Sequence, residues 1–248
     1  MITKHALPCI AIAIAALAHA AAQVAADPAA LMKAAGKGDV AEVGRLIGAG
    51  AKADATDPNG MTPLHQATSP AVAALLIEKG GSVAAKGKGG YTPLHNAVSR
   101  GLKDVVAVLL EKGADPNAAL DNGRTALMLS AERKRLEIAQ VLLAKGADTK
   151  LKDERGWTAL HYAAMKTDIP ICAALIAAGA DVNAASNGGG RPLHEAAPGG
   201  NAETVEFLIA KGAEINAKTK DGNTALAYAE DFKNQPVVDA LKKHGATR

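Results

Sequence analysis

Residues 92–117 read TPLHNAVSRGLKDVVAVLLEKGADPN, and this stretch carries the signals that decide the fold. Thr92 is a good N-cap, and Pro93 suits the first turn of a helix, where its missing N–H costs nothing. A second segment places its apolar residues on one helical stripe, formed by Val105, Val106, Leu109 and Leu110. Gly113 follows as a left-handed C-cap, and a turn-rich connector comes next. The stretch therefore predicts two short helices and an extended turn.

The same block recurs along the chain at a fixed spacing. Its copies are 30 residues apart once and 33 thereafter, and they begin at Thr62, Thr92, Thr125, Thr158, Arg191 and Thr224. A degenerate copy begins 33 residues before Thr62, at Ala29. A second marker is the helix-ending glycine, found at Gly50, Gly80, Gly113, Gly146, Gly179, Gly212 and Gly245. Markers that share one register indicate seven copies of one structural unit.

This pattern resembles the ankyrin repeat family, which has a 33-residue period and a Thr-Pro-Leu-His-x-Ala signature. The resemblance covers about residues 27 to 248. It implies an all-α fold, an ankyrin-repeat solenoid of stacked helix-turn-helix units with hairpin-like fingers, about seven units including caps. No such unit buries its apolar face alone, so stability comes from stacking between neighbours.

We expect a signal peptide at 1–20 and an ankyrin repeat domain at 21–248. The expected units are 27–58 (N-terminal cap), 59–88, 89–121, 122–154, 155–187, 188–220 and 221–248 (C-terminal cap). The polar end units favour a complete array. Unit two is three residues short within its helical part, and three residues are nearly one helical turn. Its first helix should be truncated, with a local bend or packing defect.

The N-terminus has the pattern of an export signal. Lys4 supplies positive charge, an uncharged stretch runs over 6–18, and Ala18-His19-Ala20 fits the small-x-small cleavage pattern. A membrane anchor is the alternative, but a span needs roughly 20 apolar residues. We expect an exported protein of the bacterial type, periplasmic or fully secreted. Cleavage would leave Cys172 as the only cysteine, which its apolar surroundings predict to be a small buried hydrophobe.

The composition argues against several kinds of function. A net charge of +3 is too balanced for a protein that depends on phosphate contacts, so no nucleic acid partner is expected. The equivalent histidines His65, His95, His161 and His194 could suggest a metal. However, neighbouring helices lie roughly 8–10 Å apart, too far for one ion to be shared. The resemblance implies instead that they make structural hydrogen bonds. We expect no cofactor, no metal and no enzyme activity.

The exposed positions of the repeats favour a protein partner. A solenoid presents a concave surface, and the resemblance implies contacts from fingertips and first helices. The finger positions of units three to five hold Tyr91, Arg124 and Trp157, and the ends of their first helices hold Arg100, Arg133 and Met165. Trp, Tyr and Arg are enriched at binding hot spots, and the arginines favour an acidic partner. The alternative is that Tyr91 and Trp157 only pack against the next unit.

The sequence thus predicts a non-enzymatic protein–protein interaction module. We expect it to be a monomer, exported to the periplasm, without a membrane span in the mature chain. The alternatives are a haem- or metal-handling factor or an enzyme built on the same scaffold, and an effector released from the cell.

Overall fold

The computed structural model describes residues 28–248, so the predicted signal peptide and Cys9 lie outside the described residues. This part of the chain forms seven helix pairs. They are α2 (Pro28–Lys37) with α3 (Val40–Gly48), α4 (Pro63–Gln66) with α5 (Pro70–Glu78), α6 (Pro93–Arg100) with α7 (Lys103–Glu111), α8 (Ala126–Glu132) with α9 (Leu136–Ala144), α10 (Ala159–Met165) with α11 (Ile169–Ala177), α12 (Pro192–Ala196) with α13 (Ala202–Ala210), and α14 (Ala225–Asp231) with α15 (Gln235–Lys243).

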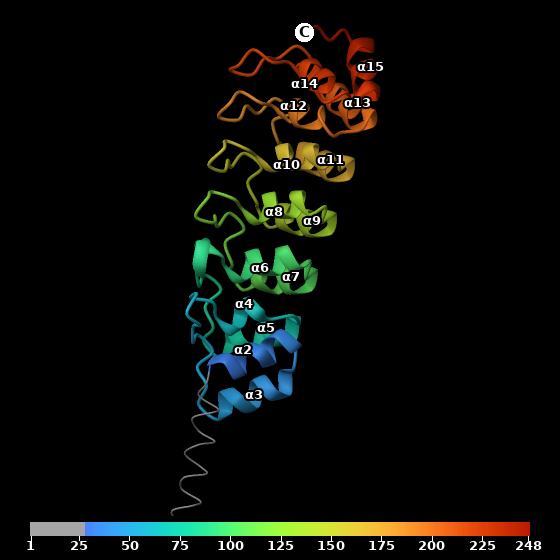
Figure 1. Ribbon diagram of the computed structural model, residues 1–248. Helices are drawn as coiled ribbons and strands as arrows, with labels where there is room; N and C mark the ends of the chain where they lie inside the picture. The colour runs from blue at the N-terminus through green and yellow to red at the C-terminus, as the bar shows by residue number, and fades with distance from the viewer. Residues whose placement is uncertain (1–27) are drawn as a thin grey trace, which may run out of the picture.

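The pairs stack in chain order into an elongated solenoid (Figure 1). We call the first helix of each pair inner and the second outer, because the inner helices lie between the outer helices and the projecting fingers (Figure 1). The all-α solenoid predicted from the sequence is confirmed. No helix within residues 28–248 is long and apolar enough to cross a membrane.

Local signals begin and end the helices as the sequence predicts. Thr92 is the N-cap of α6, and its hydroxyl accepts a hydrogen bond from the backbone N–H of His95 at 3.4 Å. Thr125 and Thr224 cap α8 and α14 in the same way. Gly113 follows the end of α7 with a φ of +87°, a backbone conformation that side chains with a Cβ rarely adopt.

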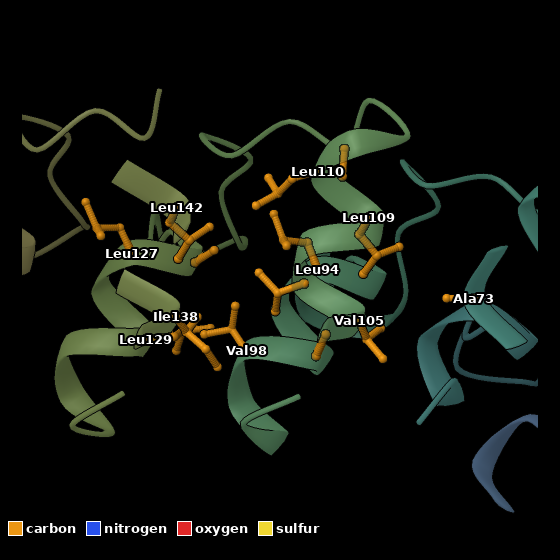
Figure 2. Packing of buried hydrophobic residues seen from close by; sticks show 14 of the residues in the cluster. Ala73, Leu94, Val98, Val105, Leu109, Leu110, Leu127, Leu129, Ile138 and Leu142 are labelled. Carbon is orange, nitrogen blue, oxygen red and sulfur yellow. The ribbon is translucent and has the colours of Figure 1, made fainter. Parts of the chain in front are cut away.

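The apolar core lies between the units. Leu94, Leu109, Leu142 and Leu160 are all completely buried. Figure 2 shows Val98 of α6 pointing toward the side chains of the next pair, where Leu129 and Ile138 lie. Each unit therefore covers the apolar face of its neighbour.

Unit two has the truncated inner helix that its missing residues predict. Its helix α4 has four residues, whereas α6 has eight. The next unit supplies donors to the carbonyl groups at this short end. Asn96 Nδ2 donates to the backbone oxygen of His65 at 3.3 Å, and Arg100 Nη1 donates to that of Gln66 at 3.0 Å. An open surface hollow of about 430 Å³ lies between Thr68 and the start of α7.

Unit six also has a short inner helix, which the sequence analysis did not predict. Helix α12 has five residues, and Pro198-Gly199-Gly200 follow it closely. Pro198 has no backbone N–H with which to extend the helical hydrogen bonds, and glycine weakens a helix. Asn234 Nδ2 donates to the backbone oxygens of Ala197 at 3.2 Å and Gly200 at 2.9 Å. Both truncated helices thus receive hydrogen bonds from a side chain of the following unit.

Cys172 provides a test of the repeat register. It is completely buried in α11, as is its equivalent Val106 in α7, and burial raises the pKa of the thiol to about 12. We expect the native protein to resist iodoacetamide at Cys172 and to react there in urea, with the site located by peptide mass spectrometry. Cys172→Ser should cost about 1–3 kcal/mol of stability, because a hydroxyl replaces an apolar group. Rapid labelling of the native protein would contradict this assignment.

Candidate functional site

The fingers form a continuous row because their turns bond to one another. Glu154 N donates to the backbone oxygen of Asn122 at 3.1 Å, and Asn187 N donates to that of Arg155 at 2.9 Å. The turn glycine allows this approach. A Cβ on Gly156, whose φ is +76°, would lie 2.6 Å from the nitrogen of Asn187. The residue after each turn glycine therefore takes an equivalent place in every finger.

Two of the predicted finger residues combine packing with partial exposure. Tyr91 is half-buried, packs on the core and meets the His95 ring edge-on at 6.1 Å. Trp157 is half-buried too, stacks on His161 at 5.8 Å and contacts Tyr162 edge-on at 5.2 Å. The packing that we considered as the alternative is therefore present, and part of each ring still faces the solvent.

Five side chains from neighbouring fingers and α10 form a group that we call the Tyr162 cluster: Arg124, Asp153, Arg155, Trp157 and Tyr162. The buried hydroxyl of Tyr162 donates to Asp153 Oδ2 at 2.7 Å and accepts from Arg155 Nη2 at 2.7 Å. The Arg155 guanidinium lies 4.1 Å from the centre of a Trp157 ring, and that of Arg124 lies 4.8 Å from the Tyr162 ring. Tyr162 thus connects the predicted residues Arg124 and Trp157.

The two arginines of the cluster differ in exposure. Arg124 forms an ion pair with Glu132, its side chain is 21% exposed, and its Nε is buried without a hydrogen-bond partner. The side chain of Arg155 is 58% exposed, while that of its ionic partner Asp153 is only 3% exposed. The accessible cation is therefore Arg155.

Sequence reasoning missed Arg155, although a signal was present. It is the only basic residue among the positions that immediately precede the turn glycines, which are Asn59, Gly89, Asn122, Arg155, Gly188 and Asp221. A hollow of about 310 Å³ lies beside it, lined by Asn122, Arg124, Asp153, Glu154, Arg155 and Tyr162. Guanidinium groups from two consecutive fingers thus meet at one concavity.

The other predicted site residues lie apart from the Tyr162 cluster. Arg100 is exposed but donates to the end of α4, so it has a structural role. Met165 is half-buried against the core. Arg133 is exposed and belongs to what we call the basic band, whose residues form no ion pair within residues 28–248. The basic band consists of Arg100, Arg133, Lys134, Arg135 and Lys166.

The histidines have the structural role that the resemblance implies. The backbone N–H of Thr158 donates to His161 Nδ1 at 3.1 Å. Because Nδ1 accepts, the hydrogen of the neutral ring lies on Nε2, which donates to the backbone oxygen of Gly190 in the next unit at 3.2 Å. The Nε2 atoms of His65 and His194 also bond to backbone oxygens of the next unit, those of Tyr91 and Ala217, whereas Nε2 of His95 is buried without a hydrogen-bond partner. Within the described range, no three side chains of metal-ligating type come together.

A repeat solenoid with an apolar core between units and a row of fingers defines a class of protein. Protein-family models match it as ankyrin repeats in three copies over residues 31–119 and 117–186, and as ankyrin repeats in many copies over residues 175–229. The chain belongs to the ankyrin repeat family. No curated protein sequence matches it. Ankyrin repeats are generally protein–protein interaction modules, and proteins built from them are typically non-enzymatic scaffolds.

The buried histidines should make the fold sensitive to acid. Burial lowers the pKa of all four, to about 4 for His95 and His161, so the folded state binds fewer protons than the unfolded state. Their stabilisation is complete above pH 6.5 and is lost as pH falls toward 4.

We expect the melting temperature, followed by circular dichroism, to fall between pH 7 and pH 4. Burial raises the pKa of Glu195 to about 7, so this single carboxyl opposes the trend. A melting temperature that rises on acidification would contradict the prediction.

Proposed function

We propose that the protein binds a partner protein through the concave side of units three to five, where Tyr91, Arg124 and Trp157 follow one another in the fingers. One observation carries this proposal. The exposed guanidinium of Arg155 lies over the half-buried Trp157 at the edge of a hollow. Trp, Tyr and Arg are the residue types most enriched at binding hot spots.

The side chains of the Tyr162 cluster are already held in place in the free protein, which favours binding. Tyr162 and Asp153 hold the Arg155 guanidinium in place by a hydrogen bond of 2.7 Å and an ion contact of 3.6 Å. Immobilising a long side chain on association costs about 0.5–1.5 kcal/mol, and much of this ordering is already present in the free protein.

The charge of this region favours an acidic partner. Arg155 is exposed, and the basic band adds Arg133 and Lys166 at the ends of the inner helices of units four and five. Complementary charge steers association and disfavours partners of the wrong sign. An acidic surface on the partner would meet these cations.

We further propose that this binding takes place after export, in the periplasm or outside the cell. The supporting observation is the sequence pattern of residues 1–20, with Lys4, the uncharged stretch and Ala18-His19-Ala20. The partner would be captured from the extracytoplasmic fraction of the source cells with the mature chain as the bait. Mass spectrometry would then identify it.

Two substitutions separate binding from packing. Trp157→Ala should weaken the captured partner's binding by about 2 kcal/mol or more and also lower the melting temperature, because this ring packs on the core. Arg155→Ala should weaken binding with a much smaller effect on melting, because its side chain is mostly exposed. Affinity is measured by isothermal titration calorimetry and stability by thermal melts.

The control is Lys145→Ala at the end of the outer helix α9. Loss of stability without loss of affinity in both variants would end the proposal.

Export predicts a defined N-terminus. The native protein should begin at Ala21, or at Gln23 if cleavage follows Ala22. N-terminal sequencing of the protein from its source cells checks this. An intact Met1 would contradict the proposed export.

A further inference from the structure

Glu195 is the one charged residue at its repeat position in units four to seven, whereas units two and three hold the polar Gln66 and Asn96 there. It lies on α12, and the equivalent positions hold Leu129 in unit four, Tyr162 in unit five and Tyr228 in unit seven. Its side chain is half-buried. A carboxyl group therefore lies between two tyrosine positions on the inner side of the solenoid.

This carboxyl group has no direct hydrogen-bond or ion-pair partner in the part of the chain that the structure describes. Glu195 forms neither a side-chain hydrogen bond nor an ion pair within residues 28–248. The nearby cation Arg155 is held by Tyr162 and Asp153, and Arg191 pairs with Glu214 at 2.8 Å. Burial disfavours the ionised form and raises the pKa of Glu195 to about 7, although the charge of nearby Arg155 acts in the opposite direction.

The finger opposite this carboxyl group has no side chain. Units four and five carry Arg124 and Trp157 at the finger position, whereas unit six carries Gly190. A Cβ on Gly190 would lie 3.1 Å from Glu195 Oε1 and 3.3 Å from Ser186 Oγ. The Glu195 carboxyl group and the Ser186 hydroxyl, both able to accept a hydrogen bond, thus lie close to the backbone of Gly190, where no finger side chain covers them.

We propose that Glu195 binds a lysine or arginine side chain of the partner protein. This inference rests on the proposed function and adds to it. A basic side chain would donate to the carboxylate and to Ser186 Oγ and would form the direct ion pair that Glu195 lacks within residues 28–248. Its methylene groups would lie near Trp157, which holds the finger position of unit five, and near Tyr228, which holds the position of Glu195 in unit seven. An acidic side chain would be repelled, and an apolar one would leave the carboxylate buried without a partner.

This contact would set the direction in which the partner binds. The exposed cations Arg133 and Arg155 belong to units four and five, and Glu195 belongs to unit six. The partner would present acidic groups to the first two units and a basic side chain to the third. A partner bound in the reverse direction would place like charges together.

The free protein offers a control for a structural role. Glu195→Gln removes no hydrogen bond or ion pair and abolishes a half-buried charge, so at pH 8 its melting temperature should equal or exceed that of the wild type. A clear loss of stability would show that Glu195 supports the fold and would overturn the proposal.

Binding is tested with a phage-displayed library of random twelve-residue peptides, selected on the full chain at pH 8. We expect the enriched peptides to share a Lys or Arg. Replacing this residue by Ala, or using Glu195→Gln, should lower affinity at least tenfold. Glu203→Gln on the outer helix α13 of the same unit is the matched control and should change affinity less than twofold. Glu195→Lys should recover binding to a peptide whose basic residue is replaced by Glu.

The outcomes separate this inference from the function on which it rests. Peptides that need Arg155 but lack a shared basic residue, or that bind Glu195→Gln as tightly as the wild type, overturn the role of Glu195 and leave the binding surface standing. Selection of no peptide, or only of peptides indifferent to Arg155→Ala and Trp157→Ala, overturns the proposed function together with this inference.

Discussion

No unit of this chain can bury its own apolar side chains, and the rest of the structure depends on that constraint. Leu94, Leu127 and Leu160 are at most 1% exposed because helices of the adjacent units cover them. The ring of His161 adds a directional bond to the backbone of the next unit. Together, burial and hydrogen bonding keep successive units in one register, which brings the fingers into a row.

The constraint also explains how the solenoid accommodates two irregular units. The short helices α4 and α12 would leave carbonyl groups without partners at their ends. Arg100 donates to the carbonyl group of Gln66 at the end of α4, and Asn234 donates to that of Ala197, the residue that follows α12. These side-chain hydrogen bonds take the place of those that the missing helical turns would have made. A solenoid can therefore tolerate a defect in one unit when the next unit supplies the missing hydrogen bonds.

Positions that stacking does not require are free to carry function. The finger residue and the exposed side of the inner helix vary from unit to unit, while Thr, Leu and the helix-ending glycine recur. Trp157 and Arg155 occupy such positions in unit five, and Glu195 does so in unit six. The resulting surface has cations and an aromatic ring beside an unpaired carboxyl group. This uneven distribution of charge is what a partner would recognise.

The sequence by itself determined the repeat, the helix pairs, the burial of Cys172 and the truncation of α4, because periodicity, caps and spacing are local signals. It also contained the signal for the short α12, which is Pro198-Gly199-Gly200. Only the tertiary structure decided that Arg124 forms an ion pair with Glu132 and that Arg155 is the exposed cation. It also decided that Trp157 packs on the core while remaining partly exposed. It alone left Glu195 without a partner. The physical reason is that repeat spacing places a backbone position, whereas the direction and pairing of its side chain depend on neighbours about 30 residues away.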